Sequence, residues 1–135
     1  MAERHFTPEE ANELLPEVRA IVERMVTHRR SLAVATVRHA RVAAKIAGNG
    51  GGVNAHEVDE LRTAAEAEAD AVARCIEELE ALGVQVKDLD EGLVDFPAWR
   101  GDEEVLLCWR LGEDEVAYWH SVDEGFAGRK SLPIE

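Results

Sequence analysis

Apolar residues between Leu15 and Leu82 recur every three or four positions, which is the spacing of one face of a helix. The first series is Leu15, Val18, Val22, Met25, Leu32, Ala43 and Ile46, and the second is Val58, Leu61, Ala65, Val72, Cys75, Leu79 and Leu82. Between the two series, the stretch AGNGGGVN (residues 47–54) is too rich in glycine to continue a helix. The pattern therefore predicts a long antiparallel helical hairpin connected by this stretch.

The start of the first helix carries two specific signals. Thr7 and Glu10 have the spacing of a capping box, in which each side chain binds the backbone N–H of the other residue. Pro16 lacks an N–H group and clashes with the preceding turn of a helix. We therefore expect a short helix near 8–14, a kink or restart at the proline, and a long helix from about 16 to 47.

The second helix is expected to begin after Asn54, as its N-cap, and to end at Gly83. Beyond Gly83 the apolar residues alternate with polar ones, as in the segments VQVKDLD, GLVDFP, EEVLLCWRL and DEVAYWHSV. Charged, glycine-containing turns separate these segments. The fold class is therefore α+β, in which a helical hairpin (about 7–83) precedes a three- or four-stranded antiparallel β-meander with a C-terminal loop (about 84–135). The length of 135 residues predicts that 1–135 form a single domain.

The length of the hairpin bears on the oligomeric state. At 1.5 Å per residue each predicted helix is about 45 Å long, whereas a compact chain of this size has a radius of gyration of roughly 14 Å. Helices rich in alanine bury little surface as a pair. We therefore expect a second copy to cover the hairpin and form an elongated homodimer.

Charge and composition exclude several classes of function. The formal net charge is −13, and acidic residues dominate after residue 50, whereas residues 1–50 carry more basic than acidic side chains. This imbalance argues against nucleic-acid binding and predicts that the basic first helix faces the acidic second one. No apolar run is long enough for a membrane helix and no targeting segment opens the chain, while Cys75 and Cys108 lie among apolar residues like reduced, buried thiols. The expected location is the cytoplasm, without membrane or nucleic-acid partners.

Polar residues interrupt the helical series at its centre. Arg29, Thr36 and His39 share the register of the first series, and Glu68 shares that of the second. They form either a paired polar layer that fixes the register of the helices or a site inside the bundle. The Glu-x-x-His motif of di-metal bundles is absent, so no metal and no cofactor are predicted. Weak metal binding by His56 or His120 with nearby carboxylates is the less favoured alternative.

The C-terminal run VAYWHSVDEGFAGRK offers the best candidate for a ligand site. Alternation along a strand places Tyr118 and His120 on one face and Trp119 on the other. A small anionic ligand would be walled by aromatic rings and held by arginines, with a histidine and an aspartate for proton transfer. The candidate binding residues are Trp109, Arg110, Tyr118, His120, Asp123 and Arg129. No catalytic motif is present and no catalytic residue is assigned.

Two segments together, FTPEEANELLPEVR and LGVQVKDLDEGLVDFPAWRGDEEVLLCWRLGEDEVAYWHSVDEGFAGRK, resemble the bacterial domain-of-unknown-function family DUF2203. The resemblance covers essentially the whole chain, and the C-terminal run is its specific part. It implies one small bacterial cytoplasmic domain, helical and then β, without an established activity. The sequence favours a non-enzymatic interaction or scaffold protein, with a site for a small anionic ligand as the alternative.

Overall fold

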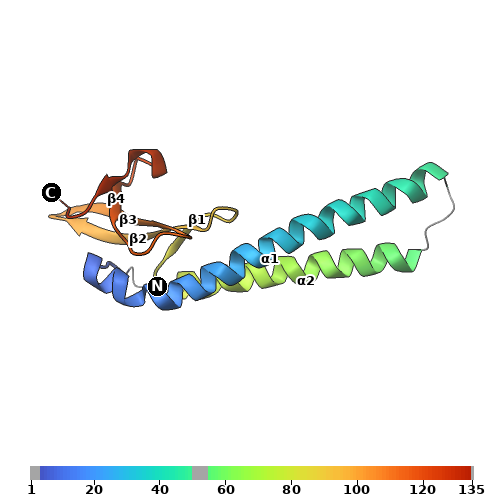
Figure 1. The fold of residues 1–135 in the computed structure, drawn as a ribbon, viewed down its shortest axis with the longest axis horizontal. Coiled ribbons are helices and arrows are strands. Elements are labelled where there is room, and N and C mark those ends of the chain that lie inside the picture. The colour runs from blue at the N-terminus through green and yellow to red at the C-terminus, as the bar shows by residue number, and fades with distance from the viewer. Residues whose placement is uncertain (1–3, 50–54, 135) are drawn as a thin grey trace.

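A computed structural model describes residues 4–49 and 55–134. Two helices, α1 (Pro8–Asn49) and α2 (Ala55–Ala81), form an antiparallel hairpin, and a sheet packs against one of its ends (Figure 1). The strands are β1 (Gln85–Asp88), β2 (Leu93–Arg100), β3 (Glu103–Arg110), β4 (Tyr118–Ser121) and β5 (Lys130–Ser131), with the short 3₁₀ helix η1 (Phe126–Gly128) before β5. The α+β class and the helical hairpin are confirmed. The expected capping by Asn54 lies outside the described residues.

Local hydrogen bonds define the start of α1 and the end of α2, which both lie next to the sheet. The Glu10 N–H donates to Thr7 Oγ1 (3.1 Å) and the Thr7 N–H donates to Glu10 Oε1 (2.8 Å), so the predicted capping box is present. Gly83 has φ +90° and ends α2 as predicted. The bonds from the Gly83 N–H to the Glu80 carbonyl and from the Val84 N–H to the Leu79 carbonyl complete a Schellman motif.

The predicted separate short helix near 8–14 and the restart at Pro16 are wrong, because α1 is continuous from Pro8 to Asn49. Pro16 is exposed. Its ring therefore faces solvent, where water can solvate the Asn12 carbonyl that loses its helical partner. The helix accommodates the proline without a break.

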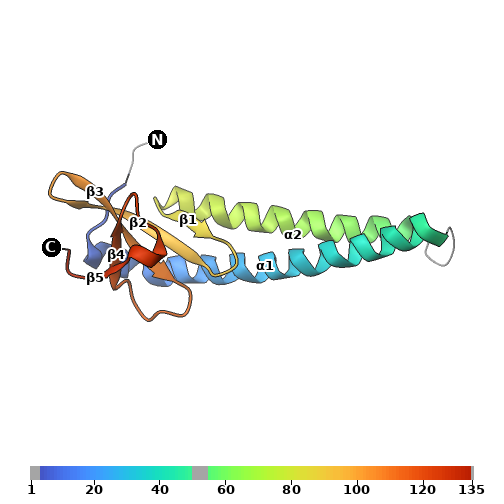
Figure 2. The ribbon, with the colours of Figure 1, turned by 90° about the horizontal axis from the view of Figure 1, so that it is seen from above.

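Among the described residues, the hydrophobic core cluster lies at the sheet end of the hairpin (Figures 1 and 2). The buried helical residues there are Ala11, Leu15, Val18, Ile21, Val22, Met25, Val26, Val72, Cys75 and Leu79. In the remainder of the described hairpin, Ala35 is the only buried apolar side chain. Predicted apolar positions farther out, such as Leu32 and Ile46, are only half-buried. The part of the hairpin far from the sheet therefore projects from the body of the protein as two helices that contact only each other.

The polar residues of the hairpin pair differently from the expectation. Glu68 forms a hydrogen bond with His28 Nδ1 (2.8 Å), and Arg29 Nε donates instead to Asp90 Oδ1 (3.1 Å) in the turn after β1. Thr36 is exposed and His39 is half-buried. The predicted layer of Arg29, Thr36 and His39 with Glu68 does not form. The register of the two helices places His28, and not Arg29, next to Glu68. The basic first helix nevertheless faces the acidic second helix, as predicted.

The sheet is fully antiparallel, with the strand order β1-β2-β3-β4-β5. It has five strands, whereas the sequence predicted three or four. The additional strand is β5, which pairs with β4 in a segment that was predicted to be a loop. One face packs on the helices through Val94, Phe96, Ala98, Val105, Leu107, Trp109 and Trp119. The opposite face carries Asp95, Leu106, Cys108, Tyr118 and His120 in cross-strand register. The β4–β5 connection lies on this second side, away from the helices (Figure 1).

Candidate functional site

The second face of the sheet contains a buried polar triad of Asp95, Cys108 and His120, one residue from each of the three central strands β2, β3 and β4. Asp95 lies directly opposite Cys108 in the ladder, and His120 lies opposite Leu106, two positions from Cys108. Asp95 is 1% exposed, Cys108 0% and His120 3%. One ligand-type atom from each side chain lies within 4.8 Å of the other two. Strand alternation puts these three side chains on one face of the sheet, and the register of β2, β3 and β4 brings them close together.

Hydrogen bonds define the protonation of the triad. His120 Nδ1 lies 2.8 Å from the Ser121 carbonyl oxygen, which can only accept, so Nδ1 carries a proton. His120 Nε2 lies 3.2 Å from Asp95 Oδ2. Burial raises the pKa of Asp95, and the neighbouring imidazole opposes that rise. Asp95 and His120 therefore form a direct contact between two ionisable groups in the interior of the sheet.

The thiol of Cys108 is an inert member of the triad in the metal-free protein. Burial, followed by the charge of Asp95, raises its pKa to about 12. At neutral pH the group is therefore a protonated thiol that hydrogen-bonds with Asp95. A thiol in this state is a poor nucleophile, which argues against a Cys–His catalytic pair at this position.

A second polar cluster surrounds Arg129, beside Tyr118. The two terminal nitrogens of Arg129 each donate to one carboxylate oxygen of Glu113, and both distances are 2.9 Å. The guanidinium lies 3.9 Å from the centre of the Tyr118 ring and 4.3 Å from that of Phe126. Burial alone would raise the pKa of Glu113, but the hydrogen bonds from Arg129 hold it below its ordinary value. This bidentate pair anchors the C-terminal segment to the sheet.

The residues selected from the sequence do not surround one cavity. Tyr118 and Arg129 meet, and the Arg110 guanidinium lies 5.2 Å from the centre of the adjoining Phe126 ring. His120 belongs to the buried triad. Trp109 points to the helical face, fully buried, because it alternates with Arg110 along β3.

Asp123 is exposed in the turn after β4. Sequence reasoning missed Asp95 and read Cys108 only as a small apolar residue. The available signal was one charged residue inside the apolar segment GLVDFPAW.

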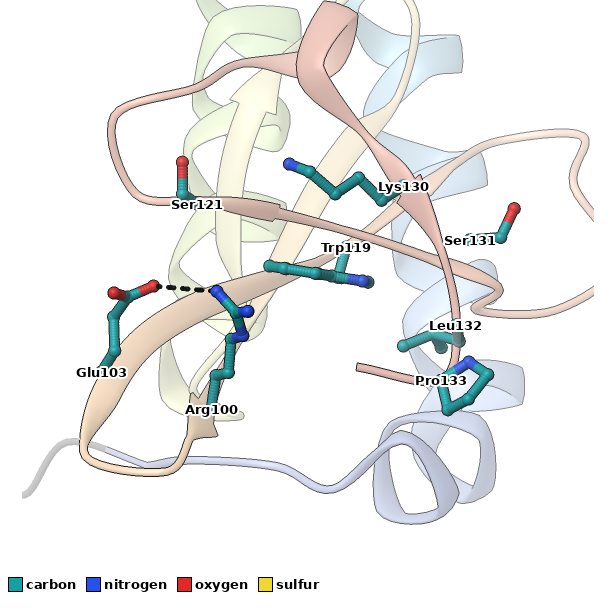
Figure 3. A pocket seen from close by; sticks show the side chains of 8 residues that line it. All are labelled: Arg100, Glu103, Trp119, Ser121, Lys130, Ser131, Leu132 and Pro133. Atoms are coloured by element: carbon teal, nitrogen blue, oxygen red, sulfur yellow. Dashed lines mark ion pairs between the residues drawn. The ribbon is translucent and has the colours of Figure 1, made fainter. Parts of the chain in front are cut away.

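An open cavity of about 470 Å³ lies at the edge of the sheet near β5 (Figure 3). Its lining is Arg100, Glu103, Trp119, Ser121, Lys130, Ser131, Leu132 and Pro133. The Arg100 guanidinium and the Lys130 ammonium lie 5.5 Å and 4.9 Å from the centre of the Trp119 ring. Arg100 also pairs loosely with Glu103, at 3.9 Å. The cavity combines two cations and an indole, although each cation has an acidic partner.

The sequence matches a family model described as an uncharacterized conserved protein (DUF2203), over residues 4–132. The chain belongs to the DUF2203 family. The resemblance seen in the sequence is thereby confirmed, and the family description assigns no activity. No curated protein and no solved structure matches this DUF2203 chain. Within the described residues of this family member, no helix has both the length and the apolar character needed to cross a membrane.

Proposed function

We propose that this DUF2203 protein is a non-enzymatic interaction or scaffold protein that forms an elongated homodimer through its outer hairpin, residues 29–49 and 55–71. The observation that carries the proposal is that Ala35 is the only buried residue of this segment among those whose burial the structure describes. Two helices that pack only on each other leave most of their apolar surface in water. A second hairpin would cover that surface and complete a four-helix bundle.

Apolar side chains on the outer hairpin are available for such a contact. Val34 is 52% exposed and Val37 is 50% exposed. Val34, Ala35, Leu61 and Ala64 also line a shallow groove of about 400 Å³ between the two helices. Small and β-branched residues at a groove allow close approach of another helix. This surface is therefore suited to helix packing.

Charge complementarity favours a second copy of the same chain as the occupant. The outer part of α1 carries the basic residues Arg29, Arg30, Arg38, Arg41 and Lys45 and no acidic residue. The outer part of α2 carries Glu57, Asp59, Glu60, Glu66, Glu68 and Asp70 against one basic residue, Arg62. Within the part of the chain that the structure describes, Arg38, Arg41 and Lys45 form no ion pair. A twofold axis would set α1 of each copy against α2 of the other, basic side against acidic side.

The test is the mass of the untagged protein in solution, by sedimentation equilibrium at micromolar concentration. The wild type should have twice the chain mass of 14.9 kDa. Val34→Glu should yield monomers, because it sets a carboxylate against the acidic α2 of the partner. The substitution should leave α1 intact, since Arg30 and Arg38 lie one turn away on either side.

Val122→Glu is the matched control, because Val122 is also 52% exposed but lies in the turn after β4. This variant should remain dimeric. A wild type that stays monomeric throughout the micromolar range would overturn the proposal, and so would equal masses for the two variants. A stable complex with a different protein, and no self-association, would point to a hetero-partner instead.

The proposal includes a single domain spanning 1–135 in a bacterial cytoplasm. Two buried, free cysteines, Cys75 and Cys108, support a reducing compartment. Limited proteolysis tests whether the chain is a single domain. We expect one protease-resistant fragment that contains both the sheet and the part of the hairpin packed against it. Separate stable fragments of the hairpin and of the sheet would contradict a single domain.

A small-molecule domain is the second candidate, with an anionic ligand at the sheet end around Arg110, His120, Asp123 and Arg129. The neighbouring cavity, with Arg100 and Lys130 over Trp119, supports it. The ion pair of Arg129 with Glu113 counts against it, because that cation is already neutralised. Amide chemical shifts during titration with inorganic phosphate and with citrate decide the question. Saturable shifts confined to the sheet end favour a ligand site, and their absence at millimolar concentration rejects it.

A further inference from the structure

The buried triad of Asp95, Cys108 and His120 combines the three side-chain types that bind zinc: carboxylate, thiol and imidazole. Its surroundings on this face, including Leu106 and Pro97, are buried. Placing ionisable groups in such a location costs stability compared with apolar residues of the same volume. A triad kept at that cost indicates a role beyond packing. We propose that Asp95, Cys108 and His120 bind one Zn²⁺ ion.

The spacing of the ligand atoms suits a tetrahedral ion. With bonds of about 2.0–2.3 Å, tetrahedral Zn²⁺ holds its ligand atoms roughly 3.3–3.7 Å apart. The Nε2 of His120 lies 3.2 Å from Asp95 Oδ2, and all three ligand-type atoms lie within 4.8 Å of one another. Small side-chain rotations therefore complete the site, because the three strands already fix the positions of the backbone.

The hydrogen bond on the far side of His120 provides independent support. A metal-bound histidine usually donates its other ring N–H to a carbonyl or carboxylate, which fixes the tautomer and the orientation of the ring. His120 Nδ1 donates to the Ser121 carbonyl at 2.8 Å, so Nε2 is directed at Asp95. The imidazole is thus already oriented as a ligand through Nε2.

The donor set also suits a divalent ion in a buried location. Zn²⁺ bound by one thiolate, one carboxylate and one neutral imidazole forms a centre with a net charge of zero, and any protons on these groups are released on binding. No electron transfer is involved, and no uncompensated charge enters the interior.

The donor set and the burial together indicate what the ion does. Among the described residues, no fourth histidine, cysteine or carboxylate joins the three, so water would complete the coordination. Three protein ligands and a water are typical of a reactive zinc site. A triad that is at most 3% exposed, however, gives no access to a substrate. The ion would therefore cross-link β2, β3 and β4.

Cobalt(II) is the probe that tests the site, since it replaces zinc and reports a thiolate ligand through a charge-transfer band in the near ultraviolet. Full-length protein is refolded with Co²⁺ so that burial does not prevent loading. The expected result is one Co²⁺ per chain with the thiolate band and intense tetrahedral d–d bands, both displaced by Zn²⁺. Cys108→Ala should abolish the thiolate band, and Asp95→Asn should weaken binding by more than about 100-fold.

Cys75→Ala is the matched control, because Cys75 is the other buried cysteine but lies on α2, away from the triad. It should keep the thiolate band and the stoichiometry. If Cys108→Ala does not fold, as judged by circular dichroism, X-ray absorption of the cobalt-loaded wild type still decides, since one sulfur and the remainder nitrogen or oxygen are expected. A wild type without the thiolate band, or a band that depends on Cys75, overturns the proposal.

Discussion

Replacing Gly92 by alanine is expected to be among the most damaging of the small substitutions in this protein. Gly92 is the last residue of the turn between β1 and β2, has φ +68° and is buried against α1. A Cβ atom at this position would lie 2.9 Å from a methyl group of Val22, 2.9 Å from Cβ of Leu111 and 3.1 Å from a methyl group of Val26. These neighbours belong to the contact that docks the sheet on the helical hairpin.

The cost has two parts. A non-glycine residue in the left-handed region costs about 1–2 kcal/mol. Forcing an additional carbon into a packed interface costs about 1–3 kcal/mol more. Gly92→Ala should therefore lower the free energy of unfolding by roughly 2–5 kcal/mol, which is a large fraction of the stability of a small domain.

Gly101→Ala is the control that separates the two contributions. Gly101 has φ +63°, close to that of Gly92, but no atom lies within 4 Å of the position of its Cβ. Only the backbone cost of about 1–2 kcal/mol should apply there. In urea titrations followed by circular dichroism, both midpoints should fall at unchanged m values, and the midpoint of Gly92→Ala should fall further. Equal losses for the two variants, within about 0.5 kcal/mol, would refute the packing argument.

Three further outcomes are expected. Asn12→Ala should destabilise the protein by about 2–4 kcal/mol in urea titrations, because the Asn12 amide pairs with both the N–H and the carbonyl of the buried Val116; Asn12→Asp should also be destabilising, since its carboxylate would face the Pro8 and Val116 carbonyl oxygens. The pKa of Glu124 is lowered from 4.5 to about 2, first by its hydrogen bond with Lys130 and then by that with Ser121. The stability it contributes is thus fully present above pH 4.5 and is lost as the pH falls towards 2, so the difference between wild type and Glu124→Gln in unfolding free energy should disappear over that interval. Both cysteines should resist a thiol reagent at neutral pH in the native, metal-free protein and react after denaturation; rapid labelling of the native protein would contradict their burial.

The fold was largely predictable because its signals are local and repeated. The capping residues Thr7 and Glu10, the glycine at position 83 and the change of period after it each act within a few residues. Pro16 misled the prediction, since a proline interrupts a helix only where its ring and the freed carbonyl cannot be accommodated. The short β5 was missed because a strand of two residues is too short to show an alternation of apolar and polar positions. Only its pairing with β4 defines it as a strand.

The candidate site was less predictable because it depends on cross-strand register. Alternation correctly separated Tyr118 and His120 from Trp119, but it could not identify which residue elsewhere in the sheet contacts the His120 side chain. That residue is Asp95 on β2, on the far side of β3 and 25 positions away along the chain. Arg129 was expected to hold an anion, and it does pair with a carboxylate, that of Glu113 in the same chain. The pattern within one strand can therefore identify a candidate site residue, but not the residues of other strands that contact it.

The two proposals concern opposite ends of the molecule and can therefore fail separately. The outer hairpin projects away from the sheet, whereas the triad lies on the face of the sheet that does not contact the helices (Figure 1). Mutations that are far apart and share no partners have additive effects. Val34→Glu should thus abolish the dimer and leave cobalt binding unchanged, and Cys108→Ala should remove the thiolate band and leave the dimer intact. Loss of both properties in one folded variant would mean that the metal and the second copy belong to one site, and the scaffold would then be metal-dependent.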